Sequence, residues 1–178
     1  MKTYTGIGSR QTPPPALKLI VRVAEQLAKA DYILRSGGAD GADDAFEIGC
    51  DKAHGRKEIY LPWKGFNGHP SPYYYVTKEA LELAESVHPV WDKCSQGARK
   101  LHGRNCYQLL GLDLNKPSDF VVCWTSGGQL SGGTATVLRL AADRDVPIYN
   151  LSSDSDVKKL GELLNYEFDL DEGYAYFF

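Results

Sequence analysis

The sequence predicts an α/β domain of the Rossmann-like kind, with a mostly parallel sheet and helices on both of its faces. Short apolar runs with strand character alternate along the chain with segments of helical periodicity. The run over residues 120–124 is continuously apolar, which is typical of a central strand covered on both sides. Glycine-rich turns join several of the strands to the helices that follow them. Together these observations favour a parallel α/β sheet over an all-helical or all-strand fold.

The predicted elements follow one another in alternating order. Strands are expected over residues 4–8, 32–34, 58–61, 120–124 and 147–151. Helices are expected over residues 17–28, 42–53, 77–87, 95–110 and 134–143, with a last one from residue 154 or 155 to 164. Pro13, Pro14 and Pro15 can occupy a loop and a first helical turn, where a missing N–H costs little. Residues 63–75 are rich in Gly, Pro, Asn and aromatics, and are predicted to form a long loop.

Length and composition limit the classes of protein. The 178 residues are enough for one domain, and 43% hydrophobic with 24% charged residues fits a globular protein with a buried core. The formal charge of -3 argues against a generally basic nucleic-acid coat, although a local basic pocket stays possible. No apolar run approaches the roughly 20 residues of a membrane span, and no signal peptide is recognised. The four cysteines form no CxxC pair, so reduced thiols and a cytoplasmic location are expected.

Three of the glycine-rich turns each follow a predicted strand and precede a helix. They span residues 6–10, 36–43 and 126–134. In open α/β sheets the carboxyl ends of the strands form the edge where ligands bind. Glycine lets a ligand approach the backbone, and a helix start offers N–H groups with a partial positive charge. Each turn alone is also explained by tight βα geometry, but three at one edge predict a site for a phosphate or another anion. The turns fit neither a dinucleotide GxGxxG nor a Walker motif.

The residues in these turns resemble the DprA/Smf proteins of the SLOG superfamily, which also contains the Lonely Guy phosphoribohydrolases. The resemblance extends from Tyr4 to the region of Leu151 and is carried by residues 6–10, 36–43, 103–105 and 131–136. It implies a single Rossmann-like nucleotide-binding domain over residues 1–178, which forms a homodimer. It also implies a nucleotide or nucleotide-derived ligand, or single-stranded DNA as in DprA.

Two departures from these families bear on activity. The DprA pattern has a histidine where this sequence has Glu47, and the Lonely Guy motif has its catalytic glutamate where this sequence has Arg139. The arginine of the Lonely Guy upstream motif is matched by Arg104. The resemblance therefore implies phosphate binding more than N-glycosidic cleavage, unless Glu47 or Asp43 acts as the general acid or base. Asp43 is also explained by its favourable charge near a helix start.

The expected ligand-binding residues come from the turns and from the region of Arg104. They are Gly8, Ser9, Arg10, Ser36, Gly37, Gly38, Asp43, Arg104, Asn105, Ser131, Gly132, Gly133 and Thr134. Arg104 is expected to hold the phosphate, because a guanidinium offers paired donors; the alternative is an exposed charge on a helix. The leading hypothesis is a nucleotide-binding protein, as a sensor or a sequesterer. The alternatives are a nucleotide N-glycosidase and a single-stranded DNA-binding protein. The net negative charge of the chain argues against the DNA-binding alternative.

Other polar and aromatic groups are considered and given lesser weight. Cys94, His102 and Cys106 match no standard zinc spacing, so no metal and no cofactor is expected, and His69 and His88 have no visible partner. Aromatics with a lysine in residues 62–67 and 73–75 predict either stacking on a nucleobase or packing beneath the loop. The apolar tail over residues 174–178 is expected to pack on the domain or on a partner subunit.

Overall fold

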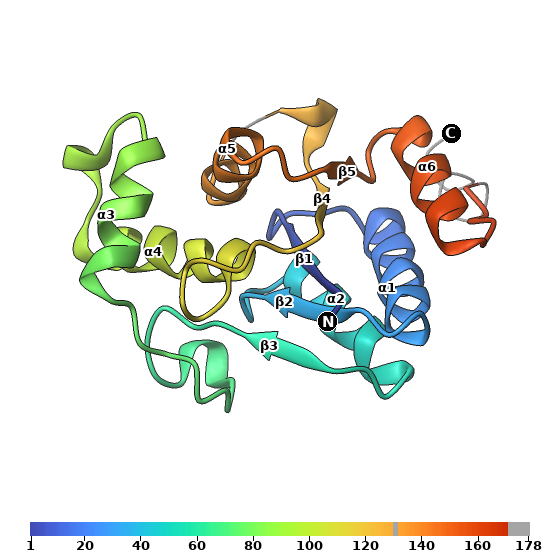
Figure 1. Cartoon of the computed structure of the whole chain (residues 1–178), viewed down its shortest axis with the longest axis horizontal. Helices are drawn as coiled ribbons and strands as arrows, with labels where there is room; N and C mark the ends of the chain where they lie inside the picture. Colours follow the sequence, from blue (N-terminus) through green and yellow to red (C-terminus); the bar gives the residue numbers. More distant parts are fainter. Residues whose placement is uncertain (130–131, 171–178) are drawn as a thin grey trace.

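The computed structural model describes residues 1–129 and 132–170, and its elements alternate as predicted (Figure 1). The strands are β1 (Thr3–Gly8), β2 (Ile33–Ser36), β3 (Lys57–Ile59), β4 (Phe120–Trp124) and β5 (Ile148–Asn150). The α-helices are α1 (Pro14–Lys29), α2 (Ala42–Lys52), α3 (Lys78–Val87), α4 (Gln96–Leu110), α5 (Thr134–Asp143) and α6 (Asp154–Leu164). Short 3₁₀ turns cover Phe66–Gly68, Trp91–Lys93 and Ser126–Gly128.

The five strands form one sheet in the order β3-β2-β1-β4-β5, and every neighbouring pair is parallel. The chain moves outward from β1 to β3, crosses back through α3 and α4, and continues from β4 to β5 on the other side. The strand order therefore reverses between β1 and β4. In open α/β sheets this switch point leaves a crevice at the carboxyl ends of the two strands. The predicted Rossmann-like fold is confirmed.

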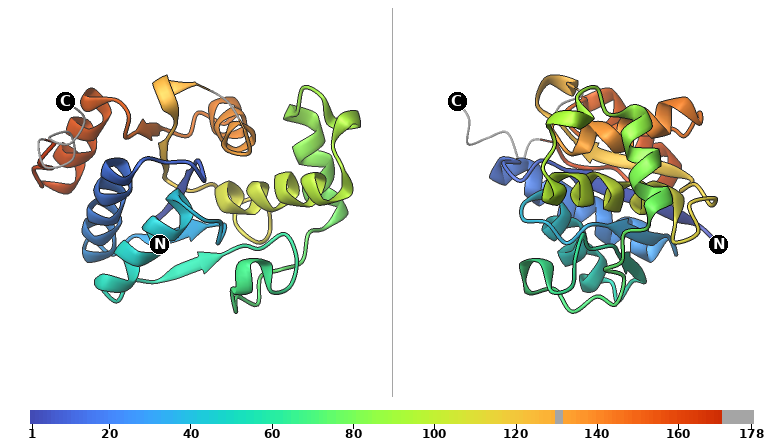
Figure 2. Two further views of the ribbon diagram at one scale, coloured as in Figure 1. Left: turned by 180° about the vertical axis from the view of Figure 1, so that it is seen from behind. Right: turned by 90° about the vertical axis from the view of Figure 1, so that its left-hand side faces the viewer.

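Helices cover both faces of the sheet, as the sequence predicts. In Figure 1 α1 and α6 lie to the right of the strands and α4 and α5 to the left, and Figure 2 shows the same layers from two other sides. Alternate residues of β4 explain this arrangement. Phe120 and Val122 pack into the core with α1, α2 and α6, while Val121 and Cys123 pack into the core with α4 and α5. A central strand that is buried on both faces must be apolar at every position, as β4 is.

The long helix α1 shows how local sequence sets an element. Its buried residues recur at helical spacing on one side and face the sheet: Leu19, Ile20, Val23, Ala24 and Leu27. Its first residues are Pro14 and Pro15, whose fixed φ suits a helix start. The prolines thus form the start of the helix, as their expected place in a loop and a first helical turn allows, ahead of the apolar periodicity that begins at residue 17.

The end of β3 differs from the prediction. β3 ends at Ile59 rather than at residue 61, because Tyr60 next forms an isolated bridge with Tyr73 of the following loop. The amide of Leu61 donates to the carbonyl of Tyr73 over 2.7 Å, which draws that loop against the sheet edge. The tail over residues 174–178, for which packing was expected, lies outside the described residues. Within the described part of the chain, no helix is both long and apolar enough to cross a membrane.

Candidate ligand-binding site

A cleft of about 1090 Å³ opens at the carboxyl ends of β1 and β4. Gly8, Ser9 and Arg10 line it after β1, and Thr125 and Ser126 line it after β4. Side chains of α4 and the start of α5 complete its walls. The cleft thus lies at the switch point of the strand order, where this class of sheet holds its ligands.

Most of the predicted binding residues come together in this cleft. Those that line it are Gly8, Ser9, Arg10, Asp43, Arg104, Asn105, Gly132, Gly133 and Thr134. Ser36, Gly37, Gly38 and Glu47 are not among its lining residues. Ser131 lies outside the described residues. The first and third glycine-rich turns therefore form the rim, and the second contributes through Ala39 and Asp43.

The turn after β1 is held by its own hydrogen bonds. Ser9 Oγ accepts from the amide of Gln11 over 3.0 Å, and the carbonyl of Ser9 accepts from Thr12 and from the amide of Ala42. Pro14 and Pro15, the first residues of α1, have no N–H to offer. The start of α1 is therefore poorer in donors than expected for an anion-binding helix start. Arg10 is the side chain of this turn that extends to solvent beside the cleft.

The turn after β2 is a structural support beneath the cleft. Ser36 is fully buried, and its hydroxyl donates to the carbonyl of Gly6 over 2.7 Å. Gly41 has a φ of +81°, and a Cβ there would lie 2.7 Å from the carbonyl oxygens of Ser9 and Arg10. Only glycine can bring the second turn so close to the first. The carboxylate of Asp43 accepts from the amide of Ala39 over 3.3 Å and fixes the loop between them.

Arg104 is buried in the protein and not extended toward a ligand. Only 5% of the residue is exposed. Its Nη1 donates to the carbonyl of Gly37 and, over 3.2 Å, to that of Tyr60, while Nε donates to Asn105 Oδ1 over 2.9 Å. The guanidinium also lies 5.5 Å from the ring centre of Phe66. These contacts tie α4 to the ends of β2 and β3, so Arg104 has a structural task besides lining the cleft.

Asp43 and Arg104 perturb each other's ionisation because both are buried. Burial raises the pKa of Asp43 to about 6, and the nearby charge of Arg104 partly opposes that rise. Burial likewise lowers the pKa of Arg104 to about 10, and Asp43 opposes it. Asp43 is the one carboxylate among the described residues that line the cleft. A group that titrates near neutrality in a cleft can transfer protons.

The start of α5 has the properties expected of an anion site. Its N-cap residue, Gly133, has no side chain to cap it, and Gly133, Thr134 and Ala135 line the cleft there. Asn105 Nδ2 donates to the carbonyl of Gly133 over 2.9 Å and so holds this helix start against α4. The first N–H groups of an uncapped helix point outward and carry a partial positive charge.

Two cationic side chains, Arg10 and Arg139, line the same cleft. Neither forms a hydrogen bond or an ion pair with any other residue that the structure describes. Arg139 lies on α5, one turn after Ala135, and is half-buried. Sequence reasoning noted Arg139 only as the residue in place of a catalytic glutamate, and did not name it as a binding residue. The signal was present, since helical spacing puts it on the same side of α5 as Ala135.

Glu47 lies beside β3, away from the cleft lining. Its Oε2 lies 3.0 Å from both Lys57 Nζ and His69 Nε2. His69 thus has a carboxylate partner that sequence spacing did not reveal. These contacts satisfy the carboxylate of Glu47 and leave Asp43 as the carboxylate near the candidate ligand.

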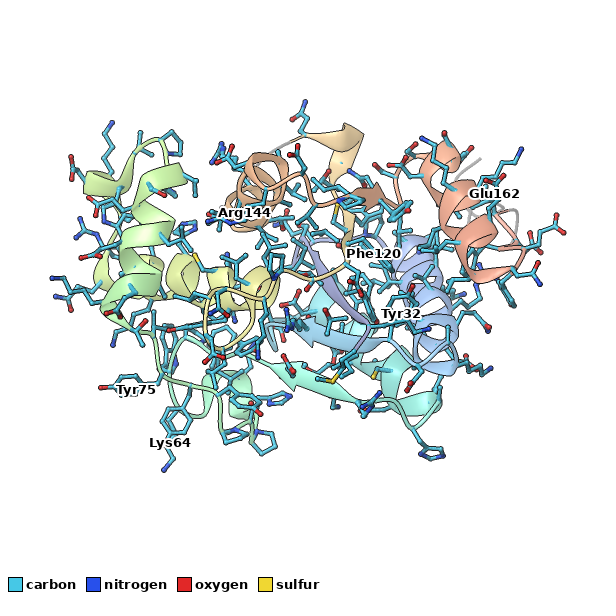
Figure 3. All side chains as sticks on the ribbon, in the orientation of Figure 1. Tyr32, Lys64, Tyr75, Phe120, Arg144 and Glu162 are labelled. Atoms are coloured by element: carbon cyan, nitrogen blue, oxygen red, sulfur yellow. The ribbon has the colours of Figure 1, made fainter. Side chains whose placement is uncertain are left out.

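The aromatic loop before α3 does not line the cleft either. Phe66 packs beneath Arg104, and Trp63 meets Phe66 edge-on with ring centres 5.2 Å apart. Figure 3 shows Lys64 and Tyr75 extending from this loop away from the body of the protein. Of the two alternatives for this loop, packing beneath it is observed for Phe66.

One group of side chains in the described residues could hold a metal ion. It consists of His88, Cys94 and His102, whose ligand atoms all lie within 4.8 Å of one another. Cys106, considered with Cys94 and His102 at the sequence level, instead donates to the carbonyls of Ala80 and His102 from inside the core. All four cysteines are free, and burial raises the pKa of Cys106 to about 12.

The fold and the cleft define a Rossmann-like α/β domain with its candidate site at the switch point of the sheet. No protein-family model matches the chain, and no curated protein matches it in sequence. Solved structures with the same fold do match. The Moco carrier protein of Chlamydomonas reinhardtii aligns at a TM-score of 0.53 and 18% identity, over 98% of this chain and 92% of that one. DNA processing protein A of Helicobacter pylori, described with a single-stranded DNA binding mode, aligns at a TM-score of 0.53 and 20% sequence identity. The alignment covers 97% of this chain and 77% of that one. The DprA-like fold predicted from the sequence is confirmed.

Proposed function

We propose that the cleft binds a nucleotide or a nucleotide-derived small molecule, with the phosphate held between the start of α5 and the side chains of Arg10 and Arg139. The observation that carries the proposal is that two arginines, which form no side-chain hydrogen bond or ion pair with the described residues, line the cleft beside the start of α5. Unpaired guanidinium groups and free helix amides both favour a phosphate. The role is binding, as in a sensor or a sequesterer.

This assignment keeps Arg10, which the sequence already predicted to bind the ligand, and replaces Arg104 by Arg139 as the second phosphate contact. Arg104 already donates to two backbone carbonyls and to Asn105, so a phosphate would compete with bonds that hold the fold together. Within the described part of the chain, Arg10 and Arg139 have no side-chain hydrogen bond or ion pair that an anion would displace. The local positive charge also explains how a chain of net charge -3 can take a phosphorylated ligand.

The two structural neighbours support a ligand of this general kind. One is described as a carrier of a molybdenum cofactor and the other as binding single-stranded DNA. The fold thus accepts both a small cofactor and a nucleic-acid strand. A cleft of about 1090 Å³ is the size of a small-molecule site, which favours a single nucleotide-sized ligand here.

The test is calorimetric titration of the protein with the four common ribonucleoside 5′-monophosphates and with the matching nucleosides. The monophosphate should bind more tightly than its nucleoside, and the difference should shrink as salt is raised. Arg10→Ala and Arg139→Ala should each weaken the monophosphate about tenfold, which is about 1.4 kcal/mol. Arg144→Ala is the matched control, because Arg144 lies at the opposite end of α5 (Figure 3). Equal affinity for nucleoside and monophosphate would contradict the proposal.

A second candidate function rests on Asp43. The buried carboxylate in the cleft, with a pKa near 6, could act as the acid or base in hydrolysis of a nucleotide N-glycosidic bond. The nucleoside monophosphates are incubated with the protein and free base is measured by chromatography. Release that is abolished by Asp43→Asn would establish the hydrolase, whereas tight binding without release would leave a binding protein. Single-stranded DNA binding and a homodimer stay predictions, tested by gel shift at two salt concentrations and by light scattering.

A further inference from the structure

His88, Cys94 and His102 bring three metal-binding atoms together beside the cleft, which His88 and His102 line. His88 follows α3, Cys94 follows the 3₁₀ turn Trp91–Lys93, and His102 lies on α4. All three residues are half-buried, so they are enclosed but reachable. Two imidazoles and one thiol form a donor set that suits zinc.

The distances are close to those of a tetrahedral site. Cys94 Sγ lies 3.7 Å from His88 Nε2 and 3.9 Å from His88 Nδ1. Zinc bonds of about 2.3 Å to sulfur and about 2.0 Å to nitrogen would place two such donors about 3.5 Å apart. The ring centres of His88 and His102 are 4.4 Å apart. Closing the three donors around one ion therefore needs only small side-chain movements.

The surroundings orient the ligands. His102 Nδ1 lies 2.9 Å from Thr136 Oγ1 of α5, which leaves His102 Nε2 for the metal. A hydrogen bond to the second ring nitrogen is the usual way to fix a metal-binding imidazole. Trp91 packs against the rings of both His88 and His102, with centres 5.9 and 6.3 Å away. The amide of Val90 contacts His88 Nδ1 over 3.2 Å, and metal ligation at either ring nitrogen would replace that contact.

Charge and position suggest what completes the coordination. His88 and His102 line the cleft together with Arg104 and Arg139, whose positive charges act on His102. These arginines favour an anion beside the metal. Three protein ligands leave a fourth tetrahedral position open, as catalytic zinc sites do. Two of the three ligands, His88 and His102, line the cleft, so an ion bound to them would lie at its wall.

From this geometry we infer a zinc site formed by His88, Cys94 and His102, with its fourth position open to an anionic ligand in the cleft. Binding releases the Cys94 thiol proton to solvent, because the thiolate is the ligand. The site differs from the sequence expectation of no metal, which grouped Cys106 and not His88 with Cys94 and His102. In the structure His88 lies beside Cys94 and His102, whereas the Cys106 side chain points into the core and bonds to the carbonyl of Ala80.

The test uses the full chain, stripped of metal and kept reduced, and titrated with Co²⁺ as a spectroscopic substitute for Zn²⁺. One equivalent should produce the intense visible bands of tetrahedral cobalt and a sulfur-to-cobalt charge-transfer band, and Zn²⁺ should displace both. Cys94→Ser should abolish the charge-transfer band. His102→Asn should weaken cobalt binding at least tenfold, because asparagine can keep the contact to Thr136 but has no equivalent of Nε2.

His54→Asn is the matched control, since His54 is exposed and outside the cluster, and it should leave cobalt binding unchanged. A measurement without any variant guards against misfolding: Zn²⁺ should protect Cys94 of the wild-type chain from alkylation, read by peptide mass spectrometry. The absence of a saturable cobalt spectrum, or a charge-transfer band that persists in folded Cys94→Ser, would overturn the inference. Because the probes are metal ions alone, that failure would leave the nucleotide proposal standing.

Discussion

Arg104 Nη1 donates to the carbonyl oxygen of Gly37, 67 residues away in the sequence. The bond joins α4 to the turn that follows β2, beneath the candidate ligand site. The same nitrogen also reaches the carbonyl of Tyr60 after β3. The Arg104 guanidinium therefore donates to backbone carbonyls at the ends of two strands. Removing it would leave these two buried carbonyls without this donor.

Replacement of Arg104 should first affect stability. Arg104→Ala removes these bonds and leaves Asp43 buried without a compensating charge, which should lower the free energy of unfolding by about 3 kcal/mol. Arg10→Ala should change it by less than about 0.5 kcal/mol, because Arg10 is exposed and its side chain forms no hydrogen bond or ion pair with residues 1–129 or 132–170. Urea unfolding followed by circular dichroism measures both. Wild-type stability in Arg104→Ala, together with lost nucleotide affinity, would return Arg104 to the role of a free phosphate ligand.

Asp43 should make stability depend on pH. Its pKa is raised from 3.8 to about 6 in the folded protein, so the folded chain holds this proton more tightly than the unfolded chain does. The stability that this proton contributes is complete below the unfolded pKa and is lost as the pH rises through 6. Asp43→Asn has no such proton. Its free energy of unfolding, relative to wild type, should therefore rise by about 2 kcal/mol between about pH 4.5 and about pH 7.5. Parallel stability curves for the two proteins would show that Asp43 titrates normally.

Gly41 should tolerate no side chain. Its φ is +81°, and a Cβ would lie 2.7 Å from two backbone oxygens in the turn after β1. Gly41→Ala should therefore cost about 3 kcal/mol, from strain and from displacement of that turn. Gly65 has a similar φ of +71° but open space around it, so Gly65→Ala should cost only about 1 kcal/mol. Thermal unfolding of the two variants separates the cost of the steric contact at Gly41 from the cost of a positive φ, which both positions share. Equal losses in the two variants would mean that the close approach of the turns does not matter.

Glu47 should be dispensable for ligand binding. It contacts Lys57 and His69 at a distance from the cleft, so Glu47→Gln should change nucleotide affinity by less than about twofold, which is close to the precision of binding measurements. Stability should fall by about 1 kcal/mol through the weakened contacts. Calorimetric titration and urea unfolding measure the two effects. Base release that is lost in Glu47→Gln but kept in Asp43→Asn would instead make Glu47 the catalytic carboxylate.

Apolar periodicity and glycine placement were enough to predict the fold. The features that predicted it are local, so neighbouring residues in the sequence are enough to recognise them. They are the uninterrupted apolar run of β4, the amphipathic pattern of α1 and the turns after β1, β2 and β4. The end of β3 differs, because it depends on a segment outside the strand: β3 ends early where Tyr60 meets Tyr73 of the following loop.

The candidate site could be predicted only in part. The turns that line the cleft were identified, because strands that run parallel must bring their carboxyl ends to one edge. The contacts of the charged residues could not be predicted. Arg104 lines the cleft but also bonds to the backbone after β2 and β3, whereas Arg139, which was not named for binding, lines the cleft with no side-chain partner among the described residues. His69 and His88 showed no partner in the sequence, yet one meets Glu47 and the other meets Cys94 and His102.

The order of residues by itself determined a doubly covered parallel sheet, its glycine turns and the edge at which they gather. Only the tertiary structure decided which polar side chains bond to the protein at that edge and which are available to a ligand. The physical reason is that hydrogen bonds between remote segments, such as that of Arg104 with Gly37, depend on how helices dock against the sheet. The packing of the helices against the sheet depends on the whole core, so it cannot be predicted from any short segment of the sequence.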